Sequence, residues 1–225
     1  MTERITYTAS PTMARFHGDD SFVRAIMGPV GSGKSTAMVF EILSRAQRQK
    51  PWNGVRRTRC LVIRNTYAEL KSTTIQTFMH WAGGLGTITY DSPIRFKAVR
   101  TLADKTIMDL EVWFLPLDRE DDVKKLKSLE VTFAWINEAS EVPGNVLDML
   151  RTRVVRYPSP SQGGPTWNGI FMDTNPPPTR HWFYELFEVN RPKNHKLFRQ
   201  PAALFGNKDD GYTPNPAAEN IRKEM

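Results

Sequence analysis

A segment near the start of the chain, GPVGSGKST at residues 28–36, constrains the fold more than any other feature of the sequence. It matches the phosphate-loop pattern G-x-x-x-x-G-K-[ST] at every fixed position, namely Gly28, Gly33, Lys34 and Ser35. Glycines let backbone N–H groups close around phosphate oxygens, the lysine adds a cation, and the serine hydroxyl can bind Mg²⁺. The pattern requires a strand before the loop and a helix after it.

The flanking residues meet this requirement. FVRAIM at 22–27 is a short apolar run typical of a strand, and apolar residues recur after the loop at helical spacing. The sequence therefore predicts binding of a nucleoside triphosphate, with a coincidental loop between packed elements as the alternative. The predicted ATP contacts in the loop are Gly28, Pro29, Val30, Gly31, Ser32, Gly33, Lys34, Ser35 and Thr36.

Charge and composition bear on the partner. The 225 residues have a net charge of +7 and a pI near 9.6, which favours a polyanion such as DNA over a membrane, because neutralised phosphates dominate nucleic-acid affinity. An unspecialised basic surface is the alternative. No signal-peptide core and no apolar run of membrane-spanning length is present in the sequence, so we expect a soluble protein of the cytoplasm.

Apolar runs at 59–65, 131–136 and 169–174 predict buried strands, the segment 94–117 is β-rich, and residues 70–82 have helical spacing. Strands that alternate with helices after a phosphate loop indicate an α/β fold with a mainly parallel central sheet flanked by helices. Residues 1 to about 20 look irregular. Beyond Pro176 the chain is proline-rich, with one candidate helix and a strand near KLFRQ. Its last residues, AENIRKEM, look like the start of a helix. We therefore expect an ATPase core over 1–180 and a lid or linker over 181–225.

A second motif follows the strand predicted at 131–136. That strand runs into Asn137 and Glu138, where hydrolases of this kind usually have Asp-Glu. Glu138 is the predicted general base, and a cap on the next helix is its alternative role. Asn137 could accept a hydrogen bond from a Mg²⁺-bound water but brings no charge to the ion. Metal affinity would then depend more on Ser35 and the nucleotide.

A third strand end carries Thr174 and Asn175, which could contact the γ-phosphate or merely form a turn. Charge on the transferred phosphoryl group also calls for an arginine. Arg151 and Arg153 lie off the buried face of a predicted helix and point outward, toward a neighbouring subunit, DNA or solvent.

Over about residues 15–180 the chain resembles the ATPase domain of a tailed-phage terminase large subunit. The resemblance rests on four segments that occur in the family's order, namely GPVGSGKST, VIRNTYAELKSTT, KLKSLEVTFAWINEAS and MDTNPP. The resemblance implies an ASCE-type P-loop NTPase fold, with Glu138 as catalytic carboxylate and Thr174 and Asn175 as coupling motif. Arg151 or Arg153 would act as a trans arginine finger. The implied Mg²⁺ site comprises Ser35 and Asn137, and adenine contacts would come from Arg15, Phe16 and His17, for which a packed N-terminal arm is the alternative.

The resemblance also implies partners. ATP hydrolysis would drive double-stranded DNA into a procapsid in the host cytoplasm. The motor would be a homomeric ring at the portal, which is a pentamer in the family, and it would work with a small terminase subunit. Many relatives carry an arginine in the phosphate loop where this chain has Val30. A nuclease domain would follow the chain, and nuclease activity is not expected within it. A helicase-like ATPase and a nucleotide-gated DNA-binding module with little turnover remain alternatives, the latter favoured by Asn137.

Overall fold

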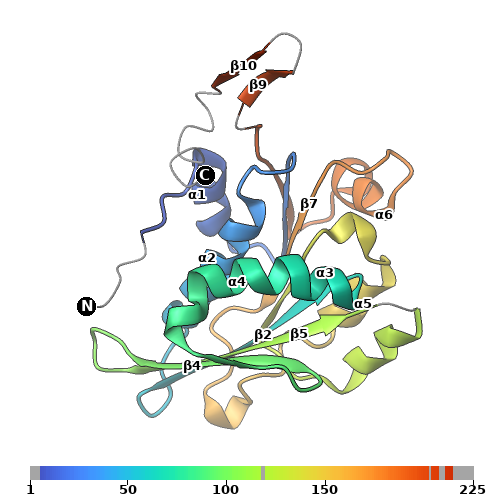
Figure 1. Ribbon diagram of the computed structural model, residues 1–225. Coiled ribbons are helices and arrows are strands. Elements are labelled where there is room, and N and C mark those ends of the chain that lie inside the picture. The colour runs from blue at the N-terminus through green and yellow to red at the C-terminus, as the bar shows by residue number, and fades with distance from the viewer. Residues whose placement is uncertain (1–5, 118–119, 203, 208–210, 215–225) are drawn as a thin grey trace.

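The computed structural model describes residues 6–117, 120–202, 204–207 and 211–214, and its centre is an eight-stranded sheet (Figure 1). The strand order is β3-β4-β5-β2-β6-β7-β1-β8. These strands are β1 (Val23–Met27), β2 (Val55–Arg64), β3 (Thr87–Thr89), β4 (Ile94–Thr101), β5 (Ile107–Pro116), β6 (Phe133–Ile136), β7 (Gly169–Thr174) and β8 (His195–Arg199). A separate antiparallel hairpin is formed by β9 (Leu204–Asn207) and β10 (Gly211–Pro214).

The helices vary in length and type. The α-helices are α1 (Pro11–His17), α2 (Lys34–Arg48), α3 (Tyr67–Glu69), α4 (Ile75–Ala82), α5 (Asn145–Arg151) and α6 (Trp182–Tyr184). Two π-helical turns, η1 (Leu70–Thr74) and η6 (Glu185–Asn190), continue α3 and α6. Short 3₁₀ helices are η2 (Gly83–Leu85), η3 (Glu120–Ser128), η4 (Ala139–Glu141) and η5 (Pro160–Gln162).

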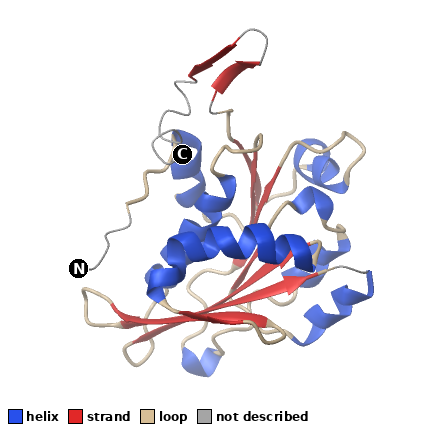
Figure 2. Cartoon of the chain, viewed as in Figure 1, coloured by secondary structure: helices blue, strands red, loops and turns tan. Residues whose placement is uncertain are grey.

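Helices cover both faces of the sheet, which makes three layers (Figure 2). On one face α1, α2 and α4 bury a core that includes Met38, Phe78 and Trp135. On the other face η3, α5, α6 and η6 bury a second core that includes Leu126 and Leu150. Figure 1 shows α3 and α4 lying across β2, β5 and β4. Of the described residues, no helix combines the length and apolar character needed to cross a membrane.

Six neighbouring strands, β5, β2, β6, β7, β1 and β8, run parallel, while β3 and β4 add an antiparallel edge. The predicted α/β fold with a mainly parallel sheet is confirmed. Because parallel strands end at the same edge, the residues that follow β1, β6 and β7 meet there. The predicted motifs are therefore brought together by pairing of strands far apart in sequence.

Two segments differ from expectation. The N-terminal region is not irregular throughout, because Ser10 caps helix α1 by accepting a hydrogen bond from the Met13 amide. The segment expected to be a lid contributes β8, which pairs with β1 inside the main sheet. The sheet thus continues past the boundary expected at residue 180. The terminal AENIRKEM, expected to begin a helix, lies outside the described residues.

A buried charge cluster ties α1, β1 and α2 together away from the phosphate loop. The Glu41 carboxylate accepts hydrogen bonds from Arg24 at 2.7 Å and Arg45 at 2.6 Å, and lies 2.6 Å from the His17 ring. The side chains of Arg24 and Glu41 are fully buried. Burial alone would raise the pKa of Glu41, but His17, Arg24 and Arg45 outweigh it and hold this pKa at about 2.

We expect Glu41→Gln to lower the free energy of unfolding by about 3–5 kcal/mol at pH 7, because it leaves buried Arg24 without its counter-charge. The folded-state pKa of about 2 lies below the ordinary 4.5, so ionised Glu41 stabilises the fold above about pH 4.5. That contribution is lost as the pH falls toward 2. Urea unfolding at pH 7 and near pH 3 should show the two proteins converging, whereas exposed Glu185→Gln should change little. An equal deficit at both pH values would contradict this assignment.

Candidate functional site

The phosphate loop joins the end of β1 to the start of α2, as the sequence predicts. Gly31 and Gly33 have φ angles of +71° and +77°, a left-handed region in which glycine has no side-chain penalty. Helix α2 begins at Lys34, so its positive N-terminal end faces the loop. Val30, between the first two glycines of the loop, is 84% exposed.

Lys34 lies inside the loop and is buried. Its ammonium donates to the Pro29 carbonyl at 2.8 Å and to Asn175 Oδ1 at 3.1 Å. Burial lowers the pKa of Lys34, and the charges of Asp173 and Glu138 partly oppose that shift. The lysine therefore connects the loop to the end of β7, where the predicted coupling residues lie.

Asp173, which the sequence analysis missed, lies at the centre of the site. Its carboxylate accepts hydrogen bonds from Ser35 Oγ at 2.8 Å and Trp135 Nε1 at 2.7 Å. Asn137 Nδ2 lies 3.1 Å from both of its oxygens. The side chain is fully buried. The register Ile26↔Asp173 in the β1–β7 pair places it beside the loop, a relation that sequence spacing does not reveal.

The Asn137 side chain hydrogen-bonds to Thr74 and Asp173, whereas the sequence predicts a contact with a Mg²⁺-bound water. Its Oδ1 accepts a hydrogen bond from Thr74 at 2.6 Å, while its NH₂ group faces Asp173. The amide oxygen is therefore already engaged, and the amide holds a carboxylate in place. An aspartate at this position would put a second carboxylate about 3 Å from Asp173, where both could not ionise freely.

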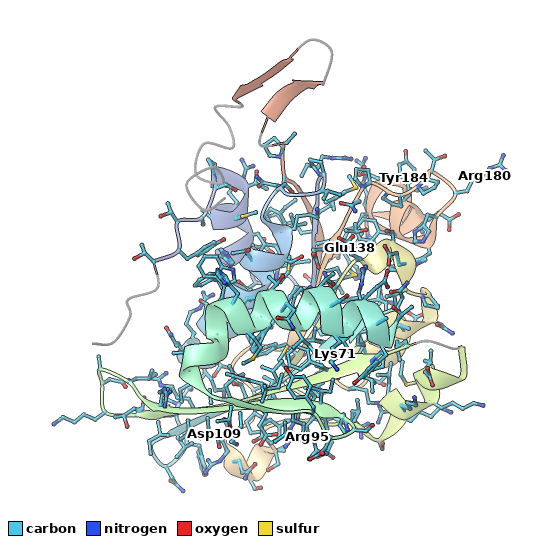
Figure 3. The ribbon with its side chains drawn as sticks, in the orientation of Figure 1. Lys71, Arg95, Asp109, Glu138, Arg180 and Tyr184 are labelled. Atoms are coloured by element: carbon cyan, nitrogen blue, oxygen red, sulfur yellow. The ribbon has the colours of Figure 1, made fainter. Side chains whose placement is uncertain are left out.

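Glu138 lies at the upper edge of the sheet, above the α3–α4 helix in Figure 3. Its φ and ψ of +48° and +59° fall in the left-handed region, an uncommon and strained conformation for glutamate. The carboxylate accepts from the Asn175 amide at 3.3 Å and makes no capping hydrogen bond to η4. Burial and the charge of Asp173 raise the pKa of Glu138, against Lys34 and Arg64.

The two predicted coupling residues contact both halves of the site. The side-chain oxygen of Asn175 accepts a hydrogen bond from Lys34, and the backbone N–H of Asn175 donates one to the Glu138 carboxylate. The buried Thr174 hydroxyl accepts from the Ser140 amide at 3.2 Å, which ties β7 to the turn after Glu138. A shift of this strand end would therefore reach the loop lysine and the glutamate together.

The structure does not bring Arg151 or Arg153 to this chain's own loop. Arg151 contacts His195 at 2.9 Å, and His195 pairs with Val23, the first residue of β1. The Arg153 carbonyl accepts from the Val131 amide, just before β6 begins. Both arginines thus lie near the amino-terminal edge of the sheet, opposite the edge that carries the loop.

The predicted adenine-contacting segment lies in helix α1. Phe16 is fully buried between Phe198, with ring centroids 5.5 Å apart, and the Arg24 guanidinium. Its ring therefore cannot stack on an adenine, and the expectation for Phe16 is wrong because the side chain is part of the core. His17 faces Glu41, whereas Arg15 is exposed.

The donors near the loop fit a magnesium ion. Mg²⁺ in nucleotide sites is usually bound through one or two carboxylates and the phosphates rather than by an all-protein cage. Ser35 and Asp173 supply a hydroxyl and a charged carboxylate at one point. No group of three or more His, Cys, Asp or Glu suited to a metal occurs in the described part of the chain.

Comparisons with known proteins bear on the family and the fold. A family model described as phage terminase large subunit matches residues 20–212. No curated protein matches the chain.

Solved structures with the same fold include the large terminase of a thermophilic bacteriophage, with a TM-score of 0.63 and 12% identity, over 84% of this chain and 45% of that one. The same phage protein in complex with ADP gives a TM-score of 0.63 at 10% identity, over 85% and 45%. The ATPase domain of the Thermus phage P74-26 large terminase gives a TM-score of 0.57 at 16% identity, over 88% of this chain and 82% of that one. The match thus spans less than half the length of the first of these proteins.

We expect Gly28→Ala to destabilise the loop. A Cβ at Gly28 would lie 2.6 Å from the Gln200 carbonyl oxygen and 3.2 Å from Ser32 Oγ, because the chain after β8 packs against the loop. Overpacking of this kind costs about 1–3 kcal/mol. Gly84→Ala is the matched control, since Gly84 is exposed with nothing near its added Cβ. Thermal unfolding should show a Tm lowered by several degrees for Gly28→Ala alone, and equal Tm values would contradict the packing argument.

Proposed function

The chain belongs to the phage terminase large subunit family, and from that membership we propose that it hydrolyses ATP to drive double-stranded DNA into a procapsid. The observation that carries the proposal is the convergence of Lys34, Ser35, Asp173 and Glu138 at one edge of the sheet. A phosphate loop, a charged metal site and a glutamate placed to act on water are the parts that phosphoryl transfer to water requires.

The residues have distinct roles in the proposed reaction. The loop amides and the Lys34 ammonium hold the β- and γ-phosphates. A water oxygen bonds to the γ-phosphorus as the bond to the β–γ bridging oxygen breaks, so that ADP leaves with that oxygen. Glu138 orients the water and takes its proton. The link through Asn175 to Lys34 supports a role for Thr174 and Asn175 in reporting the γ-phosphate.

Magnesium would be held by Ser35, with Asp173 supplying the negative charge that Asn137 lacks. Bound Mg²⁺ would neutralise charge on the β- and γ-oxygens. Asn137 then orients the carboxylate through its NH₂ group. In this arrangement the metal-site carboxylate, Asp173, comes from β7, and the catalytic glutamate, Glu138, follows the end of β6.

The wider proposal concerns partners. The positive net charge suits DNA, and a homomeric ring at the portal, a pentamer in the family, would let Arg151 or Arg153 of one subunit reach the nucleotide of its neighbour. A small terminase subunit and the host cytoplasm complete the expected setting. The helicase-like alternative would require stimulation by single strands, and Asp173 removes the reason to favour a gated module with little turnover.

We expect Lys34→Ala to abolish ATP binding and Glu138→Gln to bind ATP normally while kcat falls by about 10²–10⁴. Lys34 contributes to phosphate binding, whereas Glu138 acts only on the water. Mant-ATP titration and phosphate release, with and without linear duplex DNA, measure the two effects. Exposed Glu130→Gln, which precedes the same strand, is the control.

The outcomes separate the alternatives. Duplex DNA should stimulate turnover, and the rate per subunit should rise with protein concentration if neighbours complete the site. Hydrolysis that survives Lys34→Ala would overturn the loop assignment. Stimulation by single strands with duplex unwinding would instead support a helicase.

A charge swap tests Asp173. We expect Asp173→Asn to weaken Mg²⁺-dependent ATP binding by roughly tenfold or more, and Asn137→Asp to impair it through repulsion between two carboxylates. The double variant Asn137→Asp/Asp173→Asn restores one carboxylate and one amide, so it should recover much of the loss. ATP titrations across a Mg²⁺ series, with Mn²⁺ binding followed by EPR, measure this. A double variant as weak as the sum of both single changes would contradict the swap.

A further inference from the structure

Arg64, the last residue of β2, brings a cation to the catalytic edge of the sheet. Its neighbour Ile63 pairs with Ile136, so Arg64 lies level with Asn137 at the end of β6. The arginine side chain is 8% exposed. A guanidinium so deeply buried needs acceptors for its five N–H donors.

The protein satisfies only part of that need. Nη2 lies 3.1 Å from Glu141 Oε2 and 3.6 Å from Glu69 Oε1, and these two carboxylates are themselves about 40% exposed. Nε and Nη1 are buried and have no hydrogen-bond partner. Buried unsatisfied donors are rare in native proteins, so each one needs an explanation, and a bound ion or ligand is one such explanation.

These donors belong to a side chain that lines a small cavity of about 150 Å³. The other walls are Ser35, Asn137 and Glu138, together with Thr73, Thr74 and Thr77 from the helix that follows β2. In the proposed reaction Ser35 would hold the metal beside the β- and γ-phosphates, and Glu138 would orient the attacking water. The anion expected between them is the γ-phosphoryl group.

Arg64 lies at a different edge of the sheet from Arg151 and Arg153. Val30 leaves the loop without the arginine of many relatives, and Arg151 and Arg153 lie toward the opposite edge of the sheet. In the part of the chain that the structure describes, Arg64 is the one arginine that lines this cavity. It therefore occupies, within the same subunit, a place where charge on the transferred phosphoryl group needs a cation.

We propose that Arg64 binds the γ-phosphoryl oxygens of ATP in the same subunit and stabilises the charge that develops on them during hydrolysis. This inference rests on the proposed ATPase function. Arg64 takes no part in bond making or breaking. Glu69 and Glu141 lie beside Nη2, which leaves the N–H groups of Nε and Nη1 for the phosphoryl oxygens.

The test compares ATPγS with ADP as probes, because only ATPγS carries a γ-phosphoryl group. Arg64→Met replaces the side chain with an apolar one of similar length, and Arg64→Lys keeps the charge. We expect Arg64→Met to weaken ATPγS binding by roughly tenfold to a hundredfold, leave ADP binding within about twofold, and lower kcat about 10²–10³-fold. Arg64→Lys should recover part of the loss. Arg57→Ala, on the same strand but away from the cavity, should match the unchanged protein.

Thermal unfolding without nucleotide provides a second readout. Replacing a partly unsatisfied buried cation with methionine should leave Tm unchanged or raise it. A lowered Tm together with equal losses of ATPγS and ADP binding would show that Arg64 is only a structural anchor, which overturns the proposal. If both probes bind the unchanged protein and Arg64→Met alike, the proposal also fails while the ATPase assignment stands. An unchanged protein that binds neither probe overturns both.

Mixing experiments test the same-subunit assignment. A mixture of Arg64→Met and Glu138→Gln chains has no subunit that carries both groups. We expect no gain in ATPase rate over the separate variants. A gain would show that Arg64 acts across a subunit boundary, and it would overturn the proposal as stated.

Discussion

A single buried carboxylate, that of Asp173, connects the phosphate loop to two neighbouring strands. It accepts hydrogen bonds from Ser35 after β1, from Trp135 and Asn137 on and after β6, and it belongs to β7 between them. Fully buried carboxylates are stable only when they are well hydrogen-bonded, so the three donors must stay in register. The alignment of β1, β7 and β6 and the chemistry of the site therefore depend on the same contacts.

Two buried charge clusters in this molecule serve opposite purposes. Around Glu41, two arginines and a histidine surround one carboxylate, and this cluster joins α1 to the sheet. At the edge that carries the phosphate loop, two buried nitrogens of Arg64 have no hydrogen-bond partner, and Glu138 adopts a left-handed backbone conformation. Unpaired donors and backbone strain both oppose folding, and they persist where the surrounding structure holds them. The cluster around Glu41 stabilises the scaffold, whereas the donors of Arg64 face a cavity and are available to a ligand.

Sequence patterns predicted the local elements well and the contacts between them poorly. The loop, β1 and β7 follow from a glycine pattern and apolar runs, and all of these depend on residues close in the chain. Asp173 was overlooked because it lies inside the apolar run GIFMDT, and only the register of β7 against β1 places it beside Ser35. Phe16 was wrongly given a ligand because its burial depends on Phe198, which is 182 positions away. Strand β8 joins the sheet for a similar reason, since its partner β1 is distant in sequence.

The positions of the arginines bear on how one subunit differs from an assembly. If Arg64 binds the γ-phosphoryl group from within the subunit, a single chain can distinguish ATP from ADP without a neighbour. Arg151 and Arg153 lie toward the other edge of the sheet, so any contribution from them to a nucleotide must come from an adjacent copy. Binding selectivity and hydrolysis rate would then depend on different arginines. Asn175 contacts both Lys34 and Glu138. Binding of ATP at the loop could therefore shift the end of β7 and the segment that follows it, before an arginine of the neighbouring subunit completes the site for hydrolysis. In such an arrangement nucleotide binding sets the conformation of each subunit, and contact between subunits sets the timing of hydrolysis.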